Sequence, residues 1–316
     1  MDLDVLLGER VGLFILFFVI IIAFLIIDLG IFNKDARKIT IKAASLQTIF
    51  WIAISVAFGF VIYQFGGGKE PMLEYYSAYV TEKALSMDNI FVILLILKYF
   101  SVKEEYHHKI LFWGIIGVLI LRGIFIFVGV VLVAKIHWIL ILFGAFLVFS
   151  GVKLFFDNEE EVFDPEGDFI TRNIIKRFKV SQGDHGANFF TKENGKTVPT
   201  VLLLVLVLIE VTDLIFAVDS IPAAFAITDS RFILYTSNIF AVLGLRAMFF
   251  LLAGVMNKFY LLQKGVSFIL IFIGVKMLLE FVDIHLSTML SFLVIVLTLF
   301  LSVFLSILIP KNQGVE

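Results

Sequence analysis

Long apolar runs recur along this chain, and they restrict what it can fold into more than any other feature. Several of them extend for about 18 to 25 residues, the length that an α-helix needs to cross a hydrocarbon layer of about 30 Å. Of the 316 residues, 60% are hydrophobic, and the mean hydropathy is +1.04. The runs lack the alternation of apolar and polar residues expected in strands of a membrane β-barrel. The sequence therefore predicts an all-α, polytopic membrane protein.

Nine membrane-spanning helices are expected. They are predicted at 11–32, 45–65, 76–99, 109–134, 137–156, 199–227, 232–257, 265–283 and 287–309. The first run is too long for the core of a cleaved signal peptide, so we interpret it as a retained span. Lysine and arginine residues outside the spans lie mainly in the connections after the first, third, fifth and seventh spans. The positive-inside rule then predicts an external N-terminus and a cytoplasmic C-terminus.

The longest connection, 157–198, is therefore expected to be cytoplasmic. It begins with the acidic cluster "DNEEEVFDPEGD" and continues with the basic segment "TRNIIKRFK", which favours a short amphipathic helix at the membrane surface. Asn194-Gly195, between two short runs, predicts a β-hairpin. This connection is expected to be a solvated linker with a small folded cap, and a regulatory or metal-delivery role is the alternative.

Several function classes have no support in the sequence. The chain has no cysteine, so it has no disulfide framework, thiolate metal site or redox pair of its own. It has no HExxH pattern for zinc and no basic tract for nucleic acid. The two Gly-Asp pairs lie in the connection at 157–198, whereas an intramembrane aspartyl protease carries its motifs within spans. We therefore expect neither an enzyme nor a protein with a prosthetic group.

An internal repeat organises the chain. "TEKALSMDNI" (81–90) aligns with "TDLIFAVDSI" (212–221), "GVLILRGIF" (117–125) with "AVLGLRAMF" (241–249), and "SGVKL" (150–154) with "IGVKM" (273–277). Each copy contains three spans, so the second copy is expected to cross the membrane in the opposite direction, as in many secondary transporters. The predicted divisions are two N-terminal spans (1–75), the first repeat (76–156), the connection (157–198), the second repeat (199–283), and the last span with its tail (284–316).

Charged residues occur inside the predicted spans, where each costs about 2.5–3.5 kcal/mol at mid-bilayer. The acidic ones are Asp28, Glu82, Asp88, Glu210, Asp213 and Asp219, and the basic ones include Arg122, Arg246 and Lys276. They must pair with one another or bind a cation. We expect each arginine to hold an acidic residue through a forked hydrogen bond, with contact to an anionic substrate as the alternative. Lys276 is also expected to be paired, and Asp28 to reach the core.

A metal site is predicted around the acidic motifs. On an ideal helix, Asp213 and Asp219 are about 120° apart, so they share a face only if the helix is disturbed. Pro222 has no N–H for the carbonyl of Val218, and it is expected to break the helix there. The predicted ligands are then all oxygens, which suit Mn²⁺, Mg²⁺ or Ca²⁺. They come from Glu82, Asp88, Asn89, Glu210, Asp213, Asp219, Ser220 and the Val218 carbonyl.

Two alternatives concern this cluster. Glu210, about 180° from Asp219 on an ideal helix, is expected to line a cytoplasmic approach or to pair with an arginine instead of touching the ion. The whole cluster could also be a buried salt-bridge network that fixes helix packing. Inverted duplication of the Asp-Asn and Asp-Ser pairs favours a two-sided access path over packing alone.

The motifs "EKALSMDNIFV", "EVTDLIFAVDSIPAAFAIT", "SNIFAVLGLRAMFFLLAGV" and "FIGVKMLLEF" closely resemble the TerC family of integral membrane proteins, in particular its Alx-type branch. The resemblance covers most of the chain. It implies a multi-pass protein of the bacterial inner membrane that exports Mn²⁺, and it brings an older association with tellurium resistance. Carboxylates that carry either metal or protons would then support cation/proton antiport. The alternative is a membrane-protein assembly or envelope-stress factor whose charges are structural.

Overall fold

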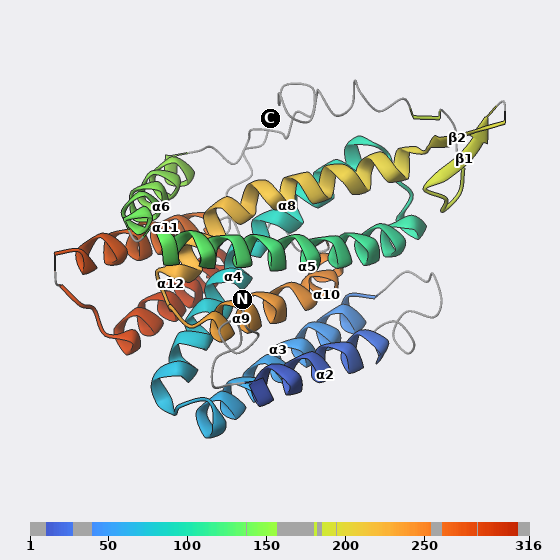
Figure 1. Ribbon diagram of the computed structural model, residues 1–316. Helices are drawn as coiled ribbons and strands as arrows, with labels where there is room; N and C mark the ends of the chain where they lie inside the picture. The colour runs from blue at the N-terminus through green and yellow to red at the C-terminus, as the bar shows by residue number, and fades with distance from the viewer. Residues whose placement is uncertain are drawn as a thin grey trace.

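The computed structural model (Figure 1) describes residues 11–27, 40–136, 138–156, 180–181, 185–193, 195–253, 261–282 and 284–308. At positions 11, 24–27, 87, 88, 91 and 280 only the backbone is described. The described chain is mostly helical, which confirms the all-α class, with one small hairpin in addition.

The helices follow the predicted spans closely. They are α2 (Val11–Ile27), α3 (Ile41–Phe65), α4 (Lys69–Tyr99), α5 (Glu104–Lys135), α6 (Ile139–Phe156), α8 (Val201–Phe225), α9 (Arg231–Leu243), α10 (Leu245–Leu252), α11 (Leu262–Glu280) and α12 (Thr288–Leu308). Among the described residues, six helices are long and apolar enough to cross a membrane, or seven if α9 and α10 form one bent span. The expected count of nine is not established, because α4 carries several charges and α2 is described over 17 residues.

The predicted hairpin is present. Strand β1 (Phe190–Glu193) pairs antiparallel with β2 (Lys196–Pro199), and Glu193 lies opposite Lys196. Gly195 has a φ of 76°, in the left-handed region that such a two-residue turn requires. The hairpin leads directly into α8 and lies at the end of that helix (Figure 1). The amphipathic segment predicted at 171–179 lies outside the described residues.

Helix α12 has the polarity of a membrane helix. It buries Ser291, Ser302 and Ser306 and exposes large apolar side chains such as Phe300 and Phe304. A soluble protein would present the opposite pattern, whereas lipid accepts apolar side chains as readily as a protein core does. The surface composition therefore agrees with an integral membrane protein.

Helices of the two halves of the chain pack against each other. Helix α4 contacts α8 and α9, α5 contacts α8 and α9, and α6 contacts α11. Helices α6 and α11 approach closely at two glycines: a Cβ atom on Gly274 would lie 2.7 Å from the Gly144 carbonyl oxygen, and one on Gly144 would lie 3.2 Å from the Gly274 carbonyl oxygen. Small residues at helix contacts allow such close packing in membranes.

The predicted helix break at Pro222 is wrong. Helix α8 runs through Pro222 to Phe225, so the Val218 carbonyl lies within a continuous helix and not in an unwound segment. Pro222 stands three residues before the end of α8, so its missing N–H removes one backbone bond, the one to Val218, near that end. In this half of the chain the helix is instead interrupted at Gly244, between α9 and α10, which are bent by 40° relative to each other.

Candidate functional site

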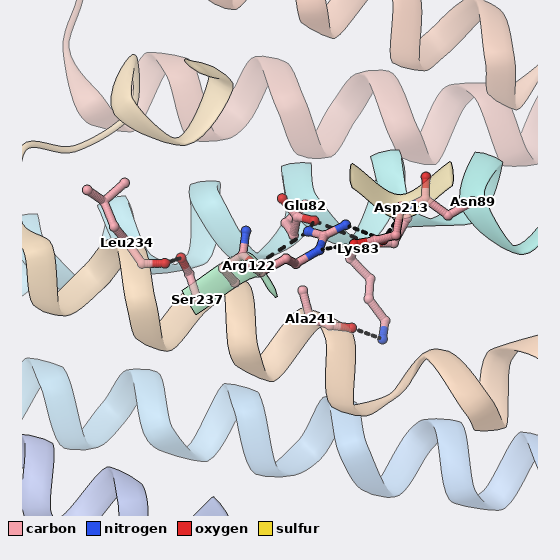
Figure 2. A network of polar contacts seen from close by, with 10 residues as sticks. Glu82, Lys83, Asn89, Arg122, Asp213, Leu234, Ser237 and Ala241 are labelled. Atoms are coloured by element: carbon pink, nitrogen blue, oxygen red, sulfur yellow. Dashed lines mark hydrogen bonds and ion pairs between the residues drawn. The ribbon is translucent and has the colours of Figure 1, made fainter. Parts of the chain in front are cut away.

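A network of charged side chains is buried where α4, α5 and α8 meet (Figure 2). The Nε and Nη2 atoms of Arg122 donate to the two carboxylate oxygens of Asp213 at 3.1 and 3.0 Å, and Nη1 donates to Glu82 Oε1. Asn89 Nδ2 donates to Asp213 Oδ1 at 2.9 Å. All four residues are at most 5% exposed. Such forked, charge-assisted bonds are strong where water is excluded.

The spacing of polar residues along α4 explains how one helix supplies several members of this network. Glu82, Ser86 and Asn89 are spaced i, i+4 and i+7, which places them on one helix face. Ser86 Oγ donates to Glu82 Oε1 at 3.4 Å. Arg122 extends from α5 and Asp213 from α8, so the network joins residues from both predicted repeats.

Two buried oxygen atoms at this network have no hydrogen-bond partner. They are Glu82 Oε2 and Asn89 Oδ1. A buried acceptor without a partner costs about 1–3 kcal/mol, and more when it is charged. Both are hard oxygen acceptors of the kind that bind hard cations, and the Glu82 carboxylate can also take up a proton. These two oxygens are therefore acceptors of the network that no hydrogen bond uses.

A buried lysine lies next to the network and points away from it (Figure 2). Lys83 is 8% exposed, and its Nζ donates to the Ala241 carbonyl oxygen at 2.9 Å. Because the helix is interrupted at Gly244, the C-terminal end of α9 presents free carbonyls to which an ammonium group is attracted. A Cβ atom on Gly244 would lie 2.6 Å from Lys83 Nζ, so glycine leaves room for the ammonium group. Lys83 thus caps the helix break.

Asp219, a second acidic motif residue of α8, contacts α6 and not Arg122. Asp219 accepts a hydrogen bond from Ser150 Oγ of α6 at 2.9 Å. Ser220 is buried, and its Oγ has no partner. Because α8 is continuous, Asp213 and Asp219 face different neighbours.

The predicted eight-member ligand set is therefore not assembled as one metal site. Within the described part of the chain, no group of three or more His, Asp or Glu residues is positioned to hold a metal ion. Val218, adjacent to Asp219, is 48% exposed at the helix surface. Asp28, and the side chain of Asp88, lie outside the described residues.

Glu210 packs closely against α5. A Cβ atom on Gly117 would lie 2.0–2.6 Å from the three atoms of the Glu210 carboxylate group, so only glycine leaves that space open. Glu210 Oε2 is buried without a hydrogen-bond partner. Glu210 stands three residues before Asp213 in α8, which places the two carboxylates on neighbouring positions of one helix face.

The remaining predicted charge-pairing residues lie elsewhere. Arg246 Nη2 lies 3.4 Å from Nδ1 of His108, at the start of α5. Lys276 Nζ donates to the Ala226 carbonyl oxygen at 3.1 Å, at the C-terminal end of α8. Both basic residues are about 6% exposed. These contacts link α10 to α5, and α11 to the residue that follows α8.

Residues 67–314 match a family described as the integral membrane protein TerC family. The chain belongs to the TerC family. It is 42% identical to the uncharacterized membrane protein STKORF319 of Myxococcus xanthus over 281 residues, which cover 89% of this chain and 88% of that protein. It is 40% identical over 285 residues to Alx of Escherichia coli (strain K12), named as a candidate membrane-bound redox modulator, with 87% of this chain and 88% of Alx covered. No solved structure matches.

Sequence reasoning missed three polar residues of this TerC-family protein. Asn238, 1% exposed, accepts a bond from Arg122 Nη1 at 3.4 Å, Ser86 contacts Glu82, and Ser150 contacts Asp219. Each is a small polar residue inside an apolar helix, and this is the only feature of the sequence that could have indicated its role. Such residues commonly satisfy their own helix backbone, so composition does not distinguish those that reach a neighbouring helix.

Proposed function

We propose that this TerC-family protein is a transporter that exports divalent metal ions, with Mn²⁺ as the expected cargo, in exchange for protons. The observation that supports this most directly is the pair of unpartnered buried oxygens, Glu82 Oε2 and Asn89 Oδ1, beside Asp213. A membrane protein retains buried carboxylates at considerable cost, and they commonly mark ion and proton pathways. Oxygen ligands also suit Mn²⁺.

In this proposal the two halves form an inverted repeat. Helix α4 of the first half packs on α9 of the second, and reciprocally α8 of the second packs on α5 of the first. The third helices of the two halves, α6 and α11, pack on each other. This reciprocal pairing supports a pseudo-two-fold relation with the Arg122 network at the interface. Alternating access would then come from rocking of one half against the other.

Arg122 occupies the position of the cargo between transport events. Its guanidinium holds Glu82 and Asp213 in place, so an entering divalent cation would replace it as the partner of both carboxylates. Glu210 and Asp219 lie about 4.5 and 9 Å along α8 from Asp213. In our proposal they receive the cation on either side of this position.

Proton exchange would provide the driving force. In the proposed orientation, with the N-terminus outside a bacterial inner membrane and the C-terminus in the cytoplasm, export moves a double positive charge against an inward-negative potential. That costs about 4.6 kcal/mol at 100 mV, from about 2.3 kcal/mol per charge. Carboxylates that release Mn²⁺ and take up protons would offset this cost.

The test is a flux measurement with the purified protein in liposomes. The uptake of Mn²⁺, Mg²⁺, Ca²⁺ and Fe²⁺ would be followed across an imposed pH gradient. We expect Mn²⁺ flux that depends on the gradient and falls at least tenfold in Glu82→Gln and Asp213→Asn. Matched controls are Glu70→Gln, at the exposed start of α4, and Asp229→Asn, exposed after α8, which should retain the flux.

The alternative is a membrane-assembly or envelope-stress factor with structural charges. The bidentate bonds of Arg122 to Asp213 favour it, since they would also fix helix packing. It predicts no metal flux with the purified protein and co-purification of a partner. Equal fluxes in Asp213→Asn, in the wild type and in protein-free liposomes would reject transport and favour this role.

A further inference from the structure

A second cluster of polar side chains lies outside the helices, beside the β1–β2 hairpin. Ser181 Oγ lies 2.5 Å from His185 Nε2, and it also donates to Glu193 Oε1. Ser181 is 2% exposed, His185 is partly exposed, and Glu193 is exposed. An imidazole nitrogen and a carboxylate oxygen thus meet at one buried hydroxyl group, beside the hairpin that leads into α8.

We propose that His185 and Glu193, with Ser181 between them, form a binding site for a divalent transition-metal ion. Imidazole and carboxylate are a common ligand pair for such ions, including Zn²⁺ and Mn²⁺. Both ligand atoms contact the same Ser181 oxygen, so they lie close enough to share one ion. Water completes the coordination, because Glu193 is open to solvent.

The hydrogen-bond directions show where the metal would be bound. The Ser181 hydroxyl has one proton, which it donates to Glu193, so its oxygen accepts from an Nε2–H group of His185. Metal binding replaces such a proton at a ligand nitrogen. An ion on Nε2 therefore replaces this proton and also displaces the Ser181 hydroxyl group, which lies 2.5 Å from Nε2 and turns away, and it then binds the neighbouring Glu193 carboxylate.

Contacts to the hairpin and to α8 hold this site in place. The Ser181 N–H donates to the Pro199 carbonyl oxygen at 2.9 Å, directly before α8. Thr200 donates from its N–H to the Phe189 carbonyl oxygen at 3.0 Å and from its hydroxyl to the Asn188 carbonyl oxygen at 2.6 Å. Lys109 of α5 donates to the Ala187 carbonyl oxygen at 2.5 Å. The ligands are thus presented by a segment bonded to two helices.

This site is separate from the Arg122 network and does not depend on the proposed transport. It lies at the start of α8, the helix that carries Asp213. A metal ion that joins His185 to Glu193 would cross-link the segment before β1 to the hairpin that leads into α8. The site would then sense metal at the extramembrane end of that helix.

The test is a Mn²⁺ titration of the full-length protein in detergent micelles, followed by electron paramagnetic resonance. Loss of the free Mn²⁺ signal measures binding, and nitrogen coupling in electron spin-echo spectra identifies an imidazole ligand. We expect His185→Ala to abolish the nitrogen coupling and Glu193→Gln to weaken this binding at least tenfold. The matched control His285→Ala, an exposed histidine between α11 and α12, should retain both.

A third variant separates metal binding from a hydrogen-bonded turn. Ser181→Ala removes the hydroxyl but keeps both ligands, so imidazole-coupled Mn²⁺ binding should persist. Wild-type protein without nitrogen coupling, or a coupling that survives in His185→Ala, would overturn the proposal. The same titration in Asp213→Asn should still show the coupling, which distinguishes this site from the transport network. Unchanged unfolding temperatures show that the variants are folded.

Discussion

Replacing Arg122 with methionine should strongly destabilise this protein. Methionine is unbranched and uncharged, so the change leaves Glu82 and Asp213 buried without a counter-charge. The guanidinium now makes bonds of 3.1 and 3.0 Å to Asp213 and a contact with Glu82. Removing one partner of a buried ion pair typically costs about 3–5 kcal/mol. We expect the free energy of unfolding to fall by that amount, whereas Arg231→Met, at the first residue of α9, should cost less.

The assay is reversible unfolding in mixed micelles with increasing dodecyl sulfate, followed by circular dichroism. A double-mutant cycle with Asp213→Asn isolates the coupling between the two side chains. The double variant leaves one unpaired carboxylate and not two, so its loss should be smaller than the sum of the single losses. The expected difference is about 0.5–3 kcal/mol. Strictly additive losses would refute the assigned contact between Arg122 and Asp213.

The same variant tests the cation site. With Arg122 absent, Mn²⁺ should stabilise the protein by binding the two buried carboxylates that Arg122 no longer neutralises. A ligand at a hundred times its dissociation constant stabilises the folded state by about 2.7 kcal/mol. Asp213→Asn in the Arg122→Met background should remove most of this gain. Failure of Mn²⁺ to raise the stability of Arg122→Met would contradict the proposed ligand role of Glu82 and Asp213.

Two glycine substitutions test close contacts beside the network. Gly117→Ala places a Cβ atom within 2.6 Å of the Glu210 carboxylate. It should lower the free energy of unfolding by about 1–3 kcal/mol and also lower the Mn²⁺ flux. The control Gly123→Ala, whose added Cβ atom would have no atom within 4 Å, should change neither quantity. Gly244→Ala should displace the Lys83 ammonium from its carbonyl and cost about 1.5–3 kcal/mol in the same unfolding assay. Its effect should not add to that of Lys83→Met, and full additivity would argue against the contact.

Much of the fold could be predicted because it depends on local properties. The apolar runs predicted where the helices lie, although α4 begins at Lys69 and not at 76, and the run at 232–257 contains two helices, α9 and α10. Asn194-Gly195 predicted the turn between β1 and β2. The position of the helix break could not be predicted in this way. Pro222 is a strong local breaker, but it stands in the last turn of α8, where the helix ends in any case. The helix is interrupted at Gly244 instead, where Lys83 of α4 donates a hydrogen bond to a free carbonyl at the end of α9.

In the candidate site, too, the sequence predicted what depends on local properties but not what depends on helix packing. The cost of burying charge predicted that acidic residues must find partners, and the repeat indicated which acids correspond. The choice of partner depended on how the helices pack: Arg122 joins Glu82, 40 residues away, to Asp213, 91 residues away. Asp219 instead meets Ser150 of α6. An undisturbed α8 keeps Asp213 and Asp219 on different faces, so the two acids could not enter one site.

By itself, the sequence determined that this chain is a helical integral membrane protein, that similar short motifs occur in its two halves, and that it carries charges needing partners. These properties follow from the cost of exposing polar groups to hydrocarbon, which acts on each segment separately. Only the tertiary structure decided that Glu82, Asn89, Arg122 and Asp213 form one network, while Asp219 meets Ser150 of α6 instead. Those contacts depend on the rotation and separation of packed helices, which are set by close approaches such as that between Gly144 and Gly274.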